Sequence, residues 1–196
     1  MHTRFFSSFI SFAVCLLLTQ FASAGDWVRF RGNDGTAASS DKLATTEWGE
    51  DDSNITWKAE LPGSGSSSPI VSGDRIYVTC YSGYGESPDQ PGSESKLARH
   101  LVCINRADGK VLWKSSVQNE ANEDRYQGFL MEHGYASSTP TTDGENIYCF
   151  FGKSGVVAFN RDGEKVWQKS VGKESGSRRW GLSLIHISEP TRRYAI

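Results

Sequence analysis

The stretch Val102-Cys-Ile-Asn-Arg-Ala-Asp-Gly-Lys-Val-Leu-Trp113 decides the fold, because it returns later in the chain in a slightly shorter form. The second copy reads Val157-Ala-Phe-Asn-Arg-Asp-Gly-Glu-Lys-Val-Trp167. In both copies an Asp-Gly pair separates two short apolar runs, which predicts a β-hairpin. Each copy ends on a tryptophan. Self-similarity of this kind indicates a repeat architecture.

The segment before each hairpin repeats as well. Ser66-Ser-Ser-Pro-Ile-Val-Ser-Gly-Asp-Arg-Ile-Tyr77 matches Ala136-Ser-Ser-Thr-Pro-Thr-Thr-Asp-Gly-Glu-Asn-Ile-Tyr148, with the two tyrosines 71 residues apart. The β-branched and aromatic runs 76–80 and 147–151 follow Gly-Asp or Asp-Gly turns and predict strands. Each copy is therefore predicted to form four short strands.

Such four-stranded units with one aromatic residue each are typical of β-propeller blades. A third tryptophan, Trp57, precedes Trp113 by 56 residues, and Trp167 follows after 54. The alternative fold is a β-sandwich, but a sandwich would not repeat the same Pro, Tyr, Gly and Trp positions. The sequence predicts an all-β protein, the N-terminal fragment of a propeller with about two blades, near 54–115 and 136–171.

The stretch from Asn105 to Trp113 resembles the Ala-x-Asp-x-x-x-Gly-x-x-x-Trp docking repeat of the quinoprotein propellers. That group includes the pyrroloquinoline quinone (PQQ) dehydrogenases and the non-enzymatic propeller of the outer-membrane β-barrel assembly machinery. The stretches 26–32 and 152–159 are similar to secreted PQQ-like repeat proteins of planctomycete type. The resemblance implies a PQQ-like propeller in an exported protein.

The resemblance assigns a structural docking motif to two sets of residues. In the first copy the set is Asn105, Gly109 and Trp113, and in the second it is Ala158, Asn160, Gly163 and Trp167. Both copies carry Asn where the family motif has Asp. The tryptophan is expected to stack on the backbone of a neighbouring blade, and the glycine to permit a tight turn and close approach of strands. The motif predicts architecture and leaves the catalytic residues unknown.

The N-terminal residues 1–24 have the pattern of a secretory signal peptide. Arg4 precedes an apolar run from Phe5 to Leu18, and Ala22-Ser23-Ala24 is a small-residue cleavage site before Gly25. The alternative is a transmembrane anchor, but the serines in the run weaken it. We expect export to the periplasm or the extracellular space, with no membrane span after cleavage.

After cleavage, residues 25–53 form an entry segment and 54–181 the partial propeller. The segment from Leu182 to Arg192 resembles the translation of a transposase adaptor used to prepare DNA sequencing libraries. It departs from the preceding pattern directly after Gly181. We therefore expect 182–196 to be a non-native tail and the natural chain to be truncated near Gly181.

The formal net charge of −2 argues against a nucleic-acid partner, because phosphate binding needs a basic surface. Cleavage would leave three cysteines, Cys80, Cys103 and Cys149. We predict Cys149 opposite Ala158, which by analogy places Cys103 opposite Val78 with Cys80 diagonal to it. A diagonal pair is too far apart for a relaxed disulfide, so we expect buried free thiols.

The resemblance implies a particular active site for the PQQ dehydrogenases. Their quinone lies on the propeller axis beside Ca²⁺. A catalytic Asp, metal ligands from Glu and Asn, and a vicinal Cys-Cys disulfide surround it. This sequence has no Cys-Cys pair, and no acidic residue can be matched to those positions. No cofactor-binding or metal residue is assignable. The sequence therefore favours a non-catalytic binding or assembly scaffold. The alternative is a PQQ-dependent periplasmic dehydrogenase whose active-site residues, with PQQ and calcium, lie in a missing C-terminal part.

Several remaining features have competing interpretations. The ligand of the scaffold is expected to be a protein or a carbohydrate, and aromatic residues of the insertions would stack on sugars: Tyr81, Tyr84 and Tyr126. The acidic runs 86–94 and 119–124 are predicted to be solvated, because their spacing matches no calcium loop. His133 is expected to be a satisfied loop histidine and 63–65 a turn.

Overall fold

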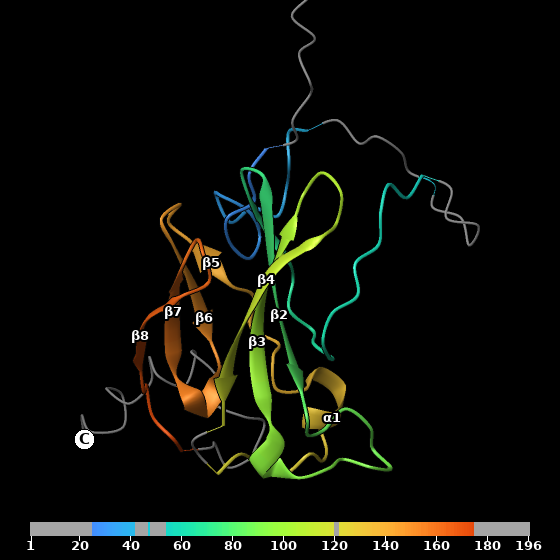
Figure 1. Ribbon diagram of the computed structural model, residues 1–196, viewed down its shortest axis with the longest axis vertical. Helices are drawn as coiled ribbons and strands as arrows, with labels where there is room; N and C mark the ends of the chain where they lie inside the picture. Colours follow the sequence, from blue (N-terminus) through green and yellow to red (C-terminus); the bar gives the residue numbers. More distant parts are fainter. Residues whose placement is uncertain (1–24, 42–46, 48–53, 120–121, 175–196) are drawn as a thin grey trace, which may run out of the picture.

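The computed structural model describes residues 25–41, 47, 54–119 and 122–174, so the predicted signal peptide and the predicted tail lie outside the described residues. The described part forms two four-stranded antiparallel sheets with strands in sequence order (Figure 1). The first contains β1 (Ile70–Ser72), β2 (Arg75–Ser82), β3 (Ala98–Asn105) and β4 (Val111–Gln118). The second contains β5 (Thr141–Thr142), β6 (Asn146–Phe150), β7 (Val156–Asn160) and β8 (Lys165–Lys169). This confirms the all-β prediction and the four strands in each repeat.

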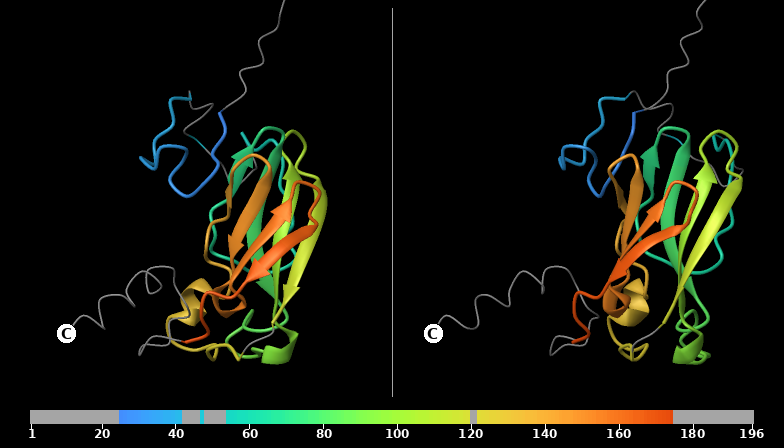
Figure 2. Two further views of the ribbon diagram at one scale, coloured as in Figure 1. Left: turned by 90° about the vertical axis from the view of Figure 1, so that its left-hand side faces the viewer. Right: turned by 60° about the vertical axis from the view of Figure 1, so that its left-hand side comes forward.

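The two sheets lie face to face, and the main hydrophobic core is the layer between them (Figure 2). β2 and β3 alternate side chains between their two faces, as strands must, so one set of residues from each strand points toward the second sheet. The first sheet contributes Tyr77, Leu101 and Cys103, and the second contributes Cys149 and Phe159, all with at most 1% of their surface exposed. A single sheet could not cover this face alone.

The opposite face of the first sheet is buried too. Val78 and Val102 belong to a second cluster on that side, against which Trp57 and Ala59 pack. The segment around Trp57 forms no strand, yet it lies over this face much as the second sheet lies over the other face. The central strands of the first sheet are therefore covered on both sides.

The predicted strand register is wrong by one residue. Cys149 lies opposite Val157 rather than Ala158, because residues 151–155 form the loop between β6 and β7 and include the 3₁₀ turn η2 (Gly152–Ser154). Phe151 N–H closes this loop by donating to the carbonyl of Gly155 at 2.8 Å. The loop is thus one residue longer than the tight hairpin that the sequence suggested.

The same shift changes the neighbours of the cysteines. Cys149 lies opposite Val157, Cys103 opposite Tyr77, and Cys80 opposite His100. Cys80 and Cys103 therefore point to opposite faces of the first sheet and belong to different hydrophobic clusters. All three thiols are buried and free, which confirms the predicted thiol state for a different geometric reason.

The longest insertions gather at one end of the sheets. The 3₁₀ turn η1 (Glu94–Lys96) and the short helix α1 (Leu130–His133) lie there (Figure 1). The chain bends at residues 62 and 63, and Ser64 then makes a β-bridge to Tyr81. Within the described ranges, no helix has both the length and the apolar character needed to cross a membrane.

Candidate functional site: the junction between the sheets

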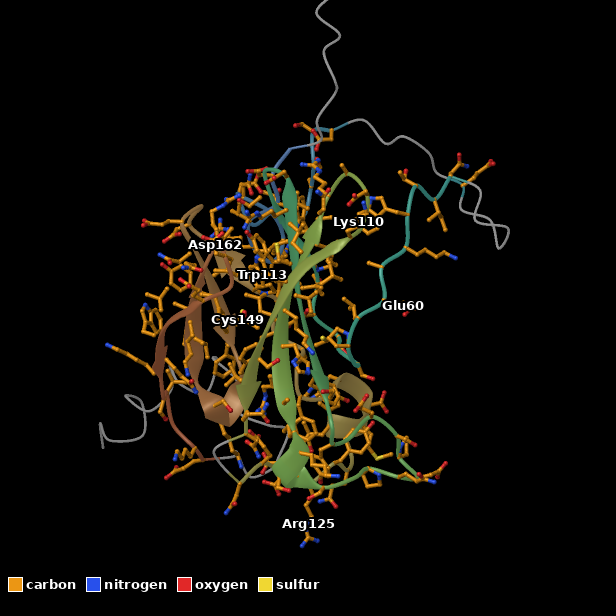
Figure 3. The ribbon with its side chains drawn as sticks, viewed as in Figure 1. Glu60, Lys110, Trp113, Arg125, Cys149 and Asp162 are labelled. Atoms are coloured by element: carbon orange, nitrogen blue, oxygen red, sulfur yellow. The ribbon has the colours of Figure 1, made fainter. Side chains whose placement is uncertain are left out.

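Trp113 links the two sheets at the end where their hairpins lie. Its side chain projects from β4 toward the β7–β8 hairpin that carries Asp162 (Figure 3). The indole Nε1–H donates to the carbonyl of Arg161 at 3.0 Å, and the ring lies against Gly163. Ser115, two residues along β4, donates its hydroxyl to the Gly163 carbonyl. One strand of the first sheet thus holds the hairpin of the second through both polar and apolar contacts.

Trp57 makes the same contacts one repeat earlier. Its Nε1–H donates to the carbonyl of Arg106 at 3.0 Å, and its ring lies against Gly109. Each tryptophan therefore packs on the glycine of the following hairpin and not on the glycine of its own. Gly109 and Trp113 belong to one sequence motif, yet Gly109 lies against Trp57 and Trp113 lies against Gly163. Within one motif, the glycine therefore contacts the preceding repeat and the tryptophan contacts the following repeat.

Each hairpin that a tryptophan contacts is held by two consecutive residues, an asparagine and an arginine, which bond to different partners. Asn105 Oδ1 accepts from the backbone N–H of Ala107 at 2.8 Å, and Asn160 Oδ1 accepts from Glu164 N–H at 2.9 Å. Arg106 donates to the Gly73 carbonyl at 3.2 Å, and the equivalent Arg161 donates to Gly144 at 3.3 Å. An amide oxygen accepts these bonds as well as a carboxylate does, which accounts for Asn at the family's Asp position.

The remaining motif residues have different environments. Ala158 is fully buried opposite Trp167 in the second sheet. Trp167 has 39% of its surface exposed, although it packs on Tyr148 at a ring distance of 5.9 Å, as Trp113 packs on Tyr77. The Trp167 ring lies on the face of the second sheet that points away from the first sheet.

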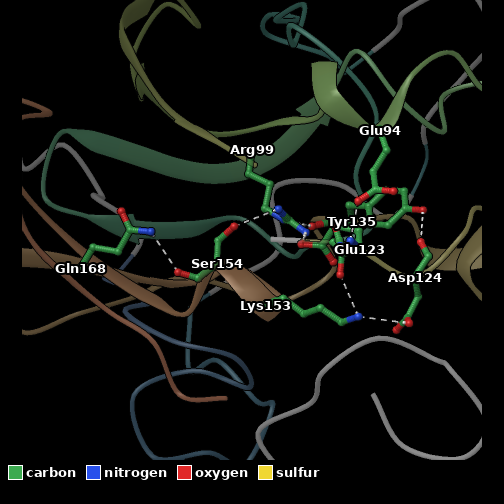
Figure 4. Close-up of polar contacts among 9 residues, drawn as sticks. Glu94, Arg99, Glu123, Asp124, Tyr135, Lys153, Ser154 and Gln168 are labelled. Atoms are coloured by element: carbon green, nitrogen blue, oxygen red, sulfur yellow. Dashed lines mark hydrogen bonds and ion pairs between the residues drawn. The ribbon is translucent and has the colours of Figure 1, made fainter. Parts of the chain in front are cut away.

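A second junction at the other end of the sheets is ionic and buried (Figure 4). Arg99 of β3 has 1% of its surface exposed and donates to the Tyr135 carbonyl at 3.0 Å and to Ser154 Oγ at 3.1 Å. Its third contact is an ion pair with Glu123 at 2.7 Å. Arg99 therefore joins the first sheet to the segment between β4 and β5, which contains Glu123 and Tyr135, and to η2 between β6 and β7.

Lys153 extends this ionic cluster. Its ammonium lies 3.2 Å from Asp124 Oδ1 and donates to the Asn122 carbonyl at 3.0 Å, with both charged side chains less than one-tenth exposed. Glu94 accepts the backbone N–H of Glu123 at 2.6 Å. The prediction that the acidic run 119–124 is solvated is wrong for Glu123 and Asp124, because each has a buried cationic partner that is distant in sequence.

The insertion tyrosines pack against one another rather than forming an open platform. Tyr81 and Tyr135 meet edge to face at 5.5 Å, and Tyr84 and Tyr126 lie beside them in the same cluster. Tyr81 is 3% exposed, and its hydroxyl donates to the Gly85 carbonyl. Burial raises the pKa of Tyr81 to about 12. These tyrosines form a small core of their own at this end of the sheets. Because Tyr81 is buried in that core, its ring is not open for stacking on a sugar.

Two histidines differ from the pattern expected of reactive groups. His100 is buried between Ser82 and Ser116, with each ring nitrogen 2.8 Å from a hydroxyl. The nearby backbone N–H of Gly83 already donates to Glu86, so it is not available to a substrate oxygen. His133 lies in α1 rather than a loop, and its buried Nδ1 makes no hydrogen bond, so the expectation of a satisfied loop histidine is wrong.

The residues described do not fit a calcium–quinone site. Among them no group of three or more His, Cys, Asp or Glu side chains lies close enough to hold a metal ion. The buried acidic side chains Glu123 and Asp124 are already paired with cations. The cysteines are separated on three different strands.

Comparison with protein families agrees with this architecture. Residues 95–188 match the family described as outer membrane protein assembly factor BamB, a range that covers β3 through β8 and extends into the predicted tail. No curated protein matches the chain. The match and the two sheets joined through Trp113 lead to one conclusion: residues 95–188 of this chain carry a PQQ-like β-propeller repeat.

Proposed function

We propose that this protein is an exported PQQ-like propeller repeat protein that acts as a non-catalytic scaffold for binding or assembling other proteins. The observation that carries the proposal is that the buried charged side chains form ion pairs with one another. Arg99, Glu123, Asp124 and Lys153 are paired with one another across the junction of the sheets. Buried charges at enzyme sites are usually poised toward a substrate, whereas these are satisfied within the fold.

The family description supports a protein ligand. The matched family is named for a factor in outer membrane protein assembly, and that name describes the family rather than this chain. A shared fold does not transfer function by itself, so the argument also depends on the site. Here Tyr81 and Tyr135 are buried and Tyr84 and Tyr126 pack against them, which leaves less aromatic surface for stacking on a sugar and favours a protein ligand.

The alternative is a PQQ-dependent periplasmic dehydrogenase. It would need a quinone and calcium site built from residues other than those paired at the two junctions. Calorimetric titration of the purified protein with PQQ in the presence of Ca²⁺ separates the alternatives. The scaffold proposal predicts no binding at micromolar PQQ, and calcium-dependent micromolar binding would favour the dehydrogenase.

Export and partner binding are tested in cells. A fusion of the chain to alkaline phosphatase, which is active only outside the cytoplasm, should be active with residues 1–24 present and inactive without them.

Chemical cross-linking of the exported chain should then capture a stoichiometric protein complex. Trp113→Ala, which opens the sheet junction, should reduce its yield, whereas the exposed hairpin variant Asp108→Asn should not. A complex equally abundant in both variants would contradict a scaffold that depends on the junction.

A further inference from the structure

The N-terminal part of the described chain crosses both sheets. Residues 25–41, here called the strap, contact the first strand of each sheet at the end where the hairpins lie (Figure 1). Trp27 and Val71 of β1 exchange backbone hydrogen bonds of 2.8 and 2.9 Å. One residue later, the Val28 carbonyl accepts the N–H of Thr142 in β5 at 3.0 Å. Two adjacent residues of the strap therefore fix the spacing between β1 and β5.

The two ends of the strap meet. The backbone nitrogen of Gly25 donates to Asp41 Oδ2 at 2.7 Å across 16 residues of chain. The neighbouring carboxylate, Asp26, is turned toward the first sheet and accepts the N–H of Gly73 at 2.9 Å. Within the strap, Arg29 donates to the Asn33 carbonyl at 2.6 Å. The strap is therefore a closed loop, and the Gly25–Asp41 contact is its closing bond.

The closing bond falls at the residue where the sequence predicts signal peptide cleavage. Before cleavage, the Gly25 nitrogen is an uncharged amide. Hydrolysis of the Ala24–Gly25 peptide bond by water leaves a carboxylate on Ala24 and an α-amino group on Gly25, which is protonated at neutral pH. The same nitrogen that donates to Asp41 then carries a full positive charge. A distance of 2.7 Å is typical of such a charge-assisted hydrogen bond.

We propose that removal of the signal peptide creates an ion pair between the Gly25 α-ammonium and the Asp41 carboxylate, and that this pair locks the strap across β1 and β5. The inference rests on the proposed export of the protein. Processing would then act on the fold as well as on location, because it adds a full positive charge to a hydrogen bond that the uncleaved chain makes with a neutral amide. The strap transmits it to both sheets through Trp27 and Val28.

The direct test is the ionisation of the α-amino group in the exported protein, purified after the host has removed its signal peptide. NMR titration of the Gly25 resonances should give an α-amino pKa about 0.5–1 unit above the ordinary value of about 7.7–8.0. Asp41→Asn should return it to the ordinary value. Asp34→Asn removes the same charge from the same strap without contacting Gly25, and should leave it raised.

A second readout follows the strap itself. The Thr142 N–H donates to Val28, so its hydrogen exchange reports strap opening. Exchange should be several-fold faster in Asp41→Asn and in protein acetylated at Gly25, with no further increase when the two changes are combined. If Asp41→Asn changes neither the α-amino pKa nor the exchange rate, the ion pair is overturned. A secreted protein that begins at a residue other than Gly25 would instead overturn the predicted processing.

Discussion

Trp113 lies so close to Gly163 that a methyl group on this glycine would be 2.7 Å from Cε3 of the indole. Trp57 and Gly109 repeat the relationship, with a corresponding distance of 2.5 Å. Both glycines also have positive φ angles, +85° and +72°. Glycine is therefore required twice at each hairpin, once for the backbone conformation and once for the space that the tryptophan of the preceding repeat fills.

Gly109→Ala should test the two requirements separately. The left-handed backbone and the clash with Trp57 should together lower the free energy of unfolding by about 2–4 kcal/mol. Gly73→Ala is the matched control, because Gly73 also has a positive φ but nothing within 4 Å of its added methyl group. It should cost only about 1 kcal/mol. Equal losses in urea unfolding would show that the contact with Trp57 adds nothing.

Glu123→Gln should strongly destabilise the protein, because it removes the charge that balances the buried Arg99 guanidinium. Breaking a buried pair in this way typically costs about 3–5 kcal/mol. Asp108→Asn is the control, since the Asp108–Lys110 pair is exposed on the β3–β4 hairpin and should contribute about 0–1 kcal/mol. Chemical denaturation measures both. A small loss for Glu123→Gln would mean that the ionic cluster does not hold the junction.

His100 should make the protein sensitive to mild acid. Burial lowers the pKa of His100, the nearby Lys114 lowers it further, and Glu86 opposes them. As pH falls below the ordinary histidine pKa of about 6.5, the unfolded chain binds a proton that the folded chain resists, so stability is lost until the lowered pKa is passed. His100→Gln should flatten this slope in the range just below about pH 6.5. An unchanged slope in His100→Gln would contradict the assignment.

The three thiols of the processed chain should be inert in the folded protein. Burial raises the pKa of Cys80 and of Cys103 to about 11, and burial also raises the pKa of Cys149. Because the thiolate is the reactive form, a colorimetric thiol reagent at pH 8 should react with none of them until denaturant is added. Three equivalents should then react at once. Rapid reaction of a thiol in the native protein would contradict the described burial.

The repeat made the strands predictable, because hairpin turns and alternating apolar residues are local signals. The contacts between repeats were not local. Trp113 reaches a glycine fifty residues further on, and the motif predicts stacking on a neighbouring blade without identifying the residue that receives the tryptophan. The register error had a similarly small cause. One extra residue in the loop before Val156 shifted every cross-strand neighbour of Cys149.

The ionic cluster was also hidden from the sequence. Glu123 and Asp124 lie in a polar, acidic run, and such runs are usually solvated. Their partners Arg99 and Lys153 are 24 and 29 residues away in sequence, and nothing in the spacing identifies them. The useful signal was the long polar segment itself, because such a segment with four tyrosines nearby can form a small core of its own.

The central claim is that the tryptophan of one repeat and the hairpin glycine of the next act as a unit that joins the sheets. A double-mutant cycle of Trp113→Ala and Gly163→Ala, measured by urea unfolding, tests it directly. Gly163→Ala alone should cost about 2–4 kcal/mol. In the Trp113→Ala background it should cost only about 1 kcal/mol, the strain of its left-handed backbone, as Gly144→Ala should in either background. Equal costs for Gly163→Ala with and without Trp113 would contradict the claim.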